Sequence, residues 1–409
     1  MIRRRQVSVA LVLALALATG VACGPGGERS PRVGEGLSVA RTLGDVGAAG
    51  FEQALEPRPF AFPADHGPHP HYRTEWWYLT GNLEAATGHH FGYQATFFRS
   101  ALTPEPIPRE SAWATDQIYM AHFALTDTAG GTFSSFERFG RDALGLAGAR
   151  AAPLRVWVED WELAARDDGT EESAATGLPP LSLRLSTPEA GLDLRLDAVK
   201  PIVLHGERGL SRKGPSPGNA SYYYSFTRID SHGTVRVDET EIAVSGESWL
   251  DREWSTSLLE PGTAGWDWLA LQLDDGSELM YFRLRGKDAA STPMGESGTV
   301  VAADGTSRQL AAGEADLAPL RSWTSPSTGT VYPSGWRLSL PAEGLELEIE
   351  PRLPQQELVH TFTYWEGAVA VNGQRQGRPV TGVGYVELTG YGDEGGTRLG
   401  TSSAVKSPL

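Results

Sequence analysis

Two carboxylic acids, Asp251 and Glu253, lie two residues apart in the segment Ser248–Trp254, which reads SWLDREW. In a β-strand such residues point to the same face, so both acids share a face with Trp249 while Arg252 points to the other. An aromatic wall desolvates a carboxyl group and raises its pKa toward the range of a general acid at neutral pH. Asp251 is therefore the candidate proton donor, with Glu253 as a second catalytic acid. The alternative is a set of surface ion pairs at a strand end.

Aromatic residues in the same segment and elsewhere are candidate ligand contacts. The faces of tryptophan rings stabilise positive charge, which suits chemistry that passes through a carbocation. Clusters of Tyr and Trp can line a ligand cavity, but they can equally fill the space between packed sheets. The candidate ligand-binding residues are Trp77, Tyr222, Tyr224, Trp249, Trp254, Trp268, Tyr364 and Trp365.

Three histidines lie beside an aspartate in the segment Asp65–His71, which reads DHGPHPH. Histidine and aspartate are zinc ligands, but the prolines force an irregular path and no matching ligand cluster occurs elsewhere. We favour an ordered loop that closes one end of a barrel over a metal site. The sequence thus predicts no metal and no other cofactor.

Motifs of several common enzyme classes are absent from the sequence. It contains no phosphate-binding glycine loop, paired cysteine motif or His-Glu-x-x-His. Gly-x-Ser-x-Gly matches at residues 214–218 and Gly-x-Gly-x-x-Gly at residues 390–395, but no helical pattern follows either match, as a nucleophile elbow or a dinucleotide fingerprint requires. An acyl-enzyme hydrolase of the common type is therefore disfavoured.

The charge balance excludes another class of partner. The chain carries 51 acidic and 35 basic residues, for a net charge of −16. Removal of a signal peptide that includes Arg3, Arg4 and Arg5 would make the charge −19. Phosphate backbones and anionic lipid surfaces repel such a protein, so we expect no nucleic acid partner.

The N-terminus predicts export. Three arginines precede an apolar run at residues 9–18, and small residues then lead to Cys23, the only cysteine. This is the pattern of a signal peptide over residues 1–22, and it is too short for a spanning helix. The unique cysteine follows it where a bacterial lipoprotein carries its lipid, so we expect a lipid anchor at Cys23; a plain secretory signal is the alternative. Gly24 is not the aspartate that retains lipoproteins in the inner membrane, which favours the periplasmic face of the outer membrane in a bacterial cell envelope.

The rest of the chain predicts an all-β fold. Residues 23–56 are rich in Gly, Pro and Ser and suit a flexible tether. Beyond them apolar and polar residues alternate with period two between Gly and Pro turns. A tryptophan-rich strand with an acid, a turn and a strand that ends in Phe-Arg occurs at residues 75–99 and again at 266–283. We therefore expect two similar antiparallel barrel or sandwich domains, at residues 57–244 and 245–395, with a seam near residues 242–246 and a tail at 396–409.

Five ordered motifs carry a resemblance to a known family. They are EWWYLTG at 75–81, WLDREW at 249–254, GWDW at 265–268, YWEG at 364–367 and GYVELTGY at 384–391. Together they look like the AttH-like proteins, which are tandem lipocalin-like proteins related to carotenoid 1,2-hydratase (hydroxyneurosporene synthase) and are often labelled predicted secreted hydrolases. The resemblance covers about residues 57–395.

The resemblance implies a role for one residue in particular. In the carotenoid hydratase branch an aspartate protonates a terminal isoprenoid double bond, and by motif position it corresponds to Asp251. That branch has Tyr and His where this chain has Trp249 and Leu250, and its assisting His and Trp fall among Tyr222–Tyr224 here. These departures argue against hydration of a carotenoid itself. Fungal relatives of the same fold hold a polyene in a productive shape.

Three functions follow as hypotheses. The first is acid-assisted hydration or isomerisation of a hydrophobic, isoprenoid- or polyene-like molecule, with Asp251 as proton donor and Trp249, Trp254 and Trp268 around the cation. The second is a lipid-anchored carrier that passes a hydrophobic compound to an envelope transporter. The third is a secreted hydrolase, which rests on the family's usual label.

Overall fold

The computed structural model describes residues 48–106, 108, 110–168, 175–287 and 293–392. The predicted signal peptide, Cys23, most of the predicted tether and the whole predicted tail lie outside these residues. Within them, none of the helical segments has the length and apolar character needed to cross a bilayer. Among the described residues, the helical segments with complete bounds are the 3₁₀ turns η1 (Ala64–His66) and η2 (Pro341–Glu343), and Ala175 and Thr176 are also helical.

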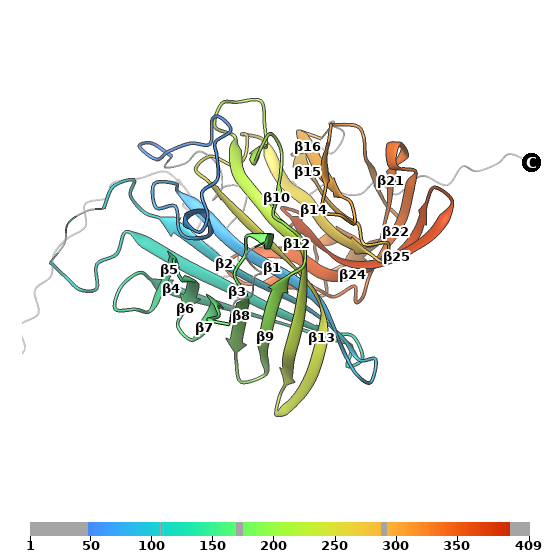
Figure 1. Ribbon diagram of the computed structural model, residues 1–409, viewed down its shortest axis with the longest axis horizontal. Coiled ribbons are helices and arrows are strands. Elements are labelled where there is room, and N and C mark those ends of the chain that lie inside the picture. Colours follow the sequence, from blue (N-terminus) through green and yellow to red (C-terminus); the bar gives the residue numbers. More distant parts are fainter. Residues whose placement is uncertain (1–47, 107, 109, 169–174, 288–292, 393–409) are drawn as a thin grey trace, which may run out of the picture. The chain divides into compact units, whose positions relative to one another are not determined.

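The first sheet curls until its edge strands β4 and β5 come together, which nearly closes a barrel (Figure 1). All its neighbouring strands are antiparallel, in the order β4-β3-β2-β1-β13-β12-β9-β8-β7-β6-β5, and β10 and β11 also pair with β12. Its strands in the described chain are β1 (Thr74–Ala85), β2 (His90–Ala101), β3 (Gln117–Asp127), β4 (Thr132–Arg141), β5 (Ala147–Ala151), β6 (Leu154–Val158), β7 (Trp161–Ala165), β8 (Leu181–Ser186), β9 (Ala190–Ala198), β10 (Val203–Leu204), β11 (Leu210–Arg212), β12 (Ala220–Val237) and β13 (Thr240–Ser255).

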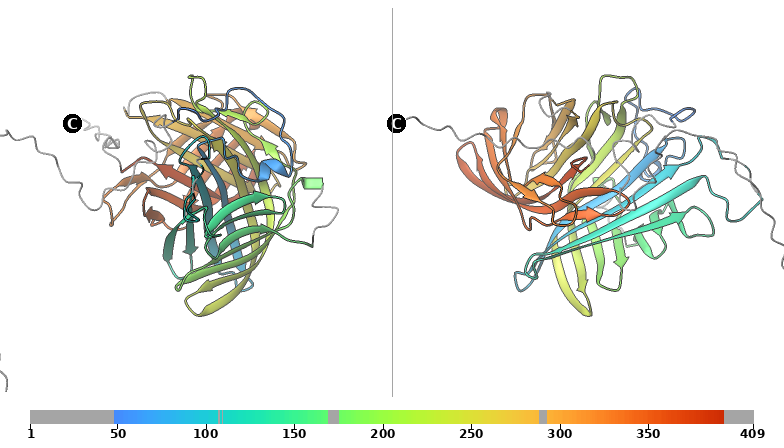
Figure 2. Two further views of the ribbon diagram at one scale, coloured as in Figure 1. Left: turned by 90° about the vertical axis from the view of Figure 1, so that its left-hand side faces the viewer. Right: turned by 180° about the vertical axis from the view of Figure 1, so that it is seen from behind.

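The second sheet is a curved antiparallel half-barrel in the order β17-β16-β15-β14-β25-β24-β22-β21-β18, with β23 paired to β24 (Figure 2). Strands β19 (Ser322–Thr324) and β20 (Val331–Pro333) form a separate hairpin. The strands of the second sheet in the described chain are β14 (Thr263–Leu273), β15 (Glu278–Gly286), β16 (Gly295–Val301), β17 (Ser307–Leu310), β18 (Asp316–Pro319), β21 (Trp336–Leu340), β22 (Leu345–Pro351), β23 (Glu357–Val359), β24 (Thr363–Arg375) and β25 (Arg378–Thr389). The predicted all-β fold with two tandem lipocalin-like domains is confirmed.

The repeated hairpins occupy equivalent places in the two sheets. In each sheet the first strand pairs with the second and with the last: β1 with β2 and β13, and β14 with β15 and β25. Gly88 and Gly276 make the tight turns with left-handed φ angles of +80° and +81°. Each hairpin contains a buried ion pair across its strands, Glu75 with Arg99 and Asp267 with Arg283. The two domains are therefore variations on one design.

The register of the hairpins shows which residues correspond between the two domains. Because the paired acids Glu75 and Asp267 correspond, Trp268 corresponds to Trp76 and not to Trp77. Trp77 points into the core of the first barrel. Its counterpart in the second domain is Leu269, which points into the core of that domain.

The boundary between the sheets lies further along the chain than predicted. The seam expected at residues 242–246 falls within β13, which pairs with β1 from Val244 to Ser255. The change of sheet instead takes place between Ser255 and Thr263, where β14 begins. A strand this long carries both the barrel rim and the acidic motif, so the motif belongs to the first sheet.

The histidine-rich segment closes one end of the first barrel. Arg252 points away from Asp251, as expected, and its guanidinium stacks on Trp77 and donates hydrogen bonds to the carbonyls of His66 and Gly67. The ring of His69 stacks on Trp254 with 3.8 Å between centroids. The segment thus acts as an ordered plug.

The two barrels pack against each other through their outer faces. A third apolar cluster, distinct from the two barrel cores, contains side chains from both sheets, including Tyr78, Trp249, Trp268 and Phe282. A buried ion pair also joins the sheets, with Lys200 Nζ 2.8 Å from Glu278 Oε2. Strands β1, β2, β12 and β13 therefore have both faces covered, one by a barrel core and one by the other domain.

Candidate functional site

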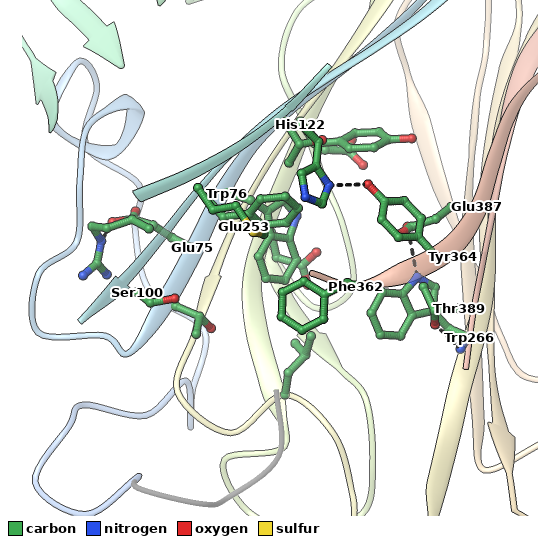
Figure 3. Close-up of a pocket in the computed structure, with 18 of the residues that line it drawn as sticks. Glu75, Trp76, Ser100, His122, Glu253, Trp266, Phe362, Tyr364, Glu387 and Thr389 are labelled. Carbon is green, nitrogen blue, oxygen red and sulfur yellow. Dashed lines mark hydrogen bonds and ion pairs between the residues drawn. The ribbon is translucent and has the colours of Figure 1, made fainter. Parts of the chain in front are cut away.

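A cavity of about 530 Å³ lies between the two sheets, outside both barrel cores. Its walls are the outer faces of β1, β2, β3 and β13 on one side and of β14, β15, β24 and β25 on the other (Figure 3). Leu258 and Leu259, in the connection between the sheets, complete the apolar lining. This volume is in the range of small-molecule sites.

Asp251 lies on the wall of this cavity and is 4% exposed. Its Oδ1 accepts hydrogen bonds from Trp249 Nε1 at 2.5 Å and from the Ser225 hydroxyl, and its Oδ2 accepts one from the Tyr223 hydroxyl at 2.6 Å. Burial raises the pKa of Asp251 to about 7, although these three donors favour the charged form, and the nearby Glu253 raises it further. Oδ2 has a single donor, so it is the oxygen with room to carry a proton.

A chain of hydrogen bonds supports Asp251 from behind. His205 Nε2 lies 2.6 Å from the Ser225 hydroxyl, and His205 Nδ1 lies 2.8 Å from the Thr299 hydroxyl on β16. Burial and the charge of Lys213 lower the pKa of His205 to about 3, so the ring is neutral. The neutral ring lies between the two hydroxyl groups and holds the Ser225 hydroxyl in place beside Asp251 Oδ1.

Glu253 lies two residues after Asp251 on β13, and neighbouring groups balance its charge. The Ser221 hydroxyl donates to its Oε1, and Lys213 Nζ lies 3.2 Å from the same oxygen. Lys213 also lies 4.0 Å from the centroid of the Phe282 ring in the second sheet. Glu253 is therefore held as one partner of an ion pair, which suits it to position Lys213 and to influence Asp251.

Two further acids, Glu366 on β24 and Glu387 on β25, face the cavity from the second sheet. They are direct cross-strand partners, so their carboxyl groups share one face. Burial raises the pKa of Glu387 to about 7, and the charges of Glu253 and Asp251 raise it further. A 3.0 Å hydrogen bond from Trp266 Nε1 lowers the pKa in part (Figure 3). Acids on opposite walls thus oppose one another's ionisation.

A histidine and a tyrosine join the walls near the mouth of the cavity. His122 Nδ1 on β3 lies 2.7 Å from the Tyr364 hydroxyl on β24, as Figure 3 shows. The other nitrogen, Nε2, lies 3.0 Å from Glu137 Oε2 on β4. The pair bridges the two domains at the edge of the site.

The geometry of the cavity is that of a place for proton transfer to an apolar molecule. It combines an aromatic-rich, mostly apolar lining, a buried acid whose pKa is near 7, and tryptophan side chains from both sheets. Among the described residues no group of three or more His, Cys, Asp or Glu side chains is arranged to hold a metal ion.

Comparison with known proteins identifies the family. The sequence profile of the AttH-like family matches residues 53–391. This chain belongs to the AttH-like family. No protein of curated function matches it.

Solved structures share the fold of this AttH-like chain. A candidate AttH protein from Nitrosomonas europaea is 36% identical, with a TM-score of 0.72 over 83% of this chain and 100% of that one. Kievitone hydratase from Nectria haematococca is 16% identical, with a TM-score of 0.61 over 83% of this chain and 98% of that one. CghA with Sch210972 is 14% identical, with a TM-score of 0.50 over 84% of this chain and 97% of that one. The last two likenesses show the fold alone.

The AttH-like cavity contains four of the residues chosen from the sequence. Asp251, Glu253, Trp268 and Tyr364 line it, and the expected common face of Asp251, Glu253 and Trp249 is present. Trp249 does not line the cavity itself but holds the Asp251 carboxyl.

The other candidate ligand contacts prove to be core residues. Trp77, Tyr222, Tyr224 and Trp254 point into the first barrel, and Trp365 points into the second. They do not line the cavity, because each lies on the strand face opposite to the residues that do. Their bulk fills the barrels, which leaves the ligand space between the domains.

Sequence reasoning missed several residues that line the cavity. Alternation offered a signal for two of them: Glu366 follows Trp365 and so points to the opposite face, and Trp76 relates to Trp77 in the same way. No local pattern marks the rest, because they reach the site from separate elements. The missed residues treated above are Trp76, His122, Lys213, Tyr223, Trp266, Glu366 and Glu387.

Proposed function

We propose that this AttH-like protein binds a hydrophobic, isoprenoid- or polyene-like molecule between its two sheets and protonates a carbon–carbon double bond in it. The observation that carries the proposal is the Asp251 carboxyl, which is buried on an aromatic wall, is hydrogen-bonded by three donors, and has a pKa near 7. Near neutral pH a substantial fraction of the molecules therefore holds a proton at this position.

The proposed step moves one proton and one electron pair. The proton leaves Asp251 Oδ2, and the π electrons of the double bond form the new C–H bond, which leaves a cation on the neighbouring carbon. Trp76 and Trp268, from opposite sheets, supply ring faces that stabilise this charge. Water then adds to the cation and gives up a proton to a carboxylate, which is hydration, or the cation loses a neighbouring proton, which is isomerisation.

Deuterium labelling tests the proposal. Signal-free protein would be incubated with farnesol in D₂O and the products examined by mass spectrometry. After exchange of the hydroxyl deuterium back into H₂O, we expect a hydrated product that keeps deuterium on carbon, or carbon-bound deuterium in recovered farnesol, with the wild type and with Asp230→Asn, whose carboxyl is exposed on β12. Asp251→Asn should bind farnesol and give neither. Equal labelling by wild type and Asp251→Asn would refute the role of Asp251.

A carrier is the second candidate, and the mostly apolar lining of the cavity favours it. A carrier would bind farnesol without labelling it, and Asp251→Asn would leave binding unchanged. Mass spectrometry of molecules that co-purify with the protein would identify the cargo. In this case the natural partner would be an envelope transporter that receives the compound.

We also propose that the protein works on the bacterial cell envelope, at the periplasmic face, held by a lipid on Cys23. The support is the sequence pattern alone: a charged start, a short apolar run and a single cysteine. A hydrophobic substrate dissolves in membranes, so an anchor would keep the cavity near its supply.

A further inference from the structure

Glu366 differs from the other acids of the cavity because, within the described residues, no cation and no well-formed hydrogen bond balances it. Its side chain lies on the cavity wall and the residue is 1% exposed, yet neither carboxyl oxygen makes a well-formed hydrogen bond within the described residues. By contrast, Asp251 has three donors, Glu253 has Ser221 and Lys213, and Glu387 has Trp266. A buried polar group without a partner costs stability, so its retention calls for an explanation.

The surroundings of Glu366 favour its neutral form. Burial and the adjacent Glu387 raise the pKa of Glu366 well above its usual range, and the Tyr78 hydroxyl opposes this only in part. A protonated carboxyl has one O–H to donate, and here that donor faces an apolar space.

A second unsatisfied donor lies on the opposite wall. The Tyr78 hydroxyl, on β1, also makes no well-formed hydrogen bond within the described residues, and burial keeps it protonated by raising its pKa. Tyr78 packs edge-on against Trp268, with 5.2 Å between ring centroids, so its position is fixed. Two neighbouring O–H groups on facing walls form a place for one acceptor oxygen.

We propose that Glu366, together with Tyr78, donates hydrogen bonds to a neutral oxygen of the ligand, so that the substrate is an uncharged hydrophobic molecule with an ether, carbonyl or hydroxyl oxygen. This inference rests on the proposed function in so far as the cavity is the ligand site. The carbon skeleton then lies along Trp268 and Phe282. The polar end fixes which double bond comes to Asp251.

Charged ligands fit this place less well. A carboxylate or phosphate would meet five acids, and the lysine and the arginine that line the cavity in the described structure are already paired, Lys213 with Glu253 and Arg99 with Glu75. An ammonium group would need Glu366 to ionise in a buried position, which desolvation opposes. The competing identity of the ligand, a hydrophobic amine, is therefore an outcome that the test must separate.

Equilibrium binding of three probes with one carbon chain tests the proposal without turnover. The probes are farnesyl methyl ether, which only accepts hydrogen bonds, farnesene, which has no polar group, and farnesylamine, which is cationic. Quenching of tryptophan fluorescence reports binding, because Trp76, Trp266 and Trp268 line the cavity. We expect the wild type to bind the ether about five- to tenfold more tightly than farnesene, the effect of roughly one to two hydrogen bonds.

Two substitutions of Glu366 separate a donor from a charge. Glu366→Gln keeps an N–H donor without charge and should retain the preference for the ether. Glu366→Leu removes one of the two donors and should reduce the preference for the ether to about two- to threefold, which the Tyr78 hydroxyl alone supplies. The Leu variant should also melt no lower than the wild type, since it replaces an unpartnered buried acid by an apolar side chain. A residue with a purely structural role would instead lower the melting temperature and leave the ether preference intact.

Each remaining result contradicts the inference in a distinct way. If Glu366→Leu keeps the full preference for the ether, Glu366 is not a donor, although the cavity and the proposed function stand. If farnesylamine binds most tightly and Glu366→Gln loses it, the ligand is an amine and the inference is wrong. If none of the three probes binds, both the inference and the proposed ligand class fail.

Discussion

Replacement of Asp251 by asparagine should change how the stability of the protein depends on pH. Asn has the shape of a protonated Asp, but an NH₂ group replaces one of the two oxygens that accept hydrogen bonds in Asp251. One of Ser225, Tyr223 and Trp249 then loses its acceptor. An unsatisfied buried donor costs about 1–3 kcal/mol, so near pH 5 the variant should be less stable than the wild type by that amount.

At higher pH the comparison should move in favour of the variant. The folded-state pKa of Asp251 is raised from 3.8 to about 7, so the folded protein holds this proton more tightly than the unfolded chain does. The wild type therefore loses stability as the pH rises from about 4 to about 7. At about 1.36 kcal/mol for each pH unit, the loss is roughly 4 kcal/mol, of which about 3 kcal/mol falls between pH 5 and pH 8. Asparagine has no proton to lose, so the variant does not undergo this part of the loss in stability.

Denaturant unfolding at pH 5, 6, 7 and 8 measures the effect. We expect the stability difference between wild type and Asp251→Asn to shift by about 3 kcal/mol over this range, toward the variant. Glu387 also has a pKa near 7, so the variant should keep a shallower slope of the same sign. Asp230→Asn, on the exposed face of β12, should run parallel to the wild type. Parallel profiles for the wild type and Asp251→Asn would refute the raised pKa and with it the proton donor.

Two further substitutions address the anchor and the barrel end. Cys23→Ser should release the protein from membrane fractions into the soluble fraction, as followed by immunoblotting, and a variant that stays bound would disprove the anchor. Glu75→Gln should cost about 3–5 kcal/mol of unfolding free energy, because Arg99 and Arg252 both pair with this buried carboxylate and would be left without it. Glu348→Gln, whose side chain is 59% exposed in a 3.7 Å pair with Arg337, is the control and should change stability by less than about 1 kcal/mol. Similar losses for both substitutions would contradict the importance of burial.

Much of the fold follows from local patterns in the sequence. Leu181, Leu183 and Leu185 alternate with polar residues and indeed point into the first barrel on β8. Gly88 and Gly276 mark hairpin turns that only a residue tolerant of positive φ makes easily. The common face of Asp251 and Glu253 needs only the period of a strand.

The direction of each face could not be predicted in the same way. In β1 both faces are buried, since Trp77 packs in a barrel core while Trp76 faces the cavity. Hydrophobic alternation distinguishes inside from outside only when one face meets water. The sequence alone therefore does not show whether Trp77 or Trp76 faces the cavity. The same holds for the neighbouring residues Trp365 and Glu366. Contacts between sheets, such as His122 with Tyr364, join residues far apart in the sequence and leave no local trace.

The placement of the cavity separates the packing of each barrel core from the lining of the ligand space. Each barrel folds around its own core, and the side chains that face the ligand project from the outer face of the same strands. An exchange at Glu366 or Trp268 can therefore alter what is bound without removing an atom from either interior. Gene duplication would have supplied two such outer faces at once, and the sequence of each would have been free to diverge. The arrangement offers a physical basis for a change of ligand within one architecture.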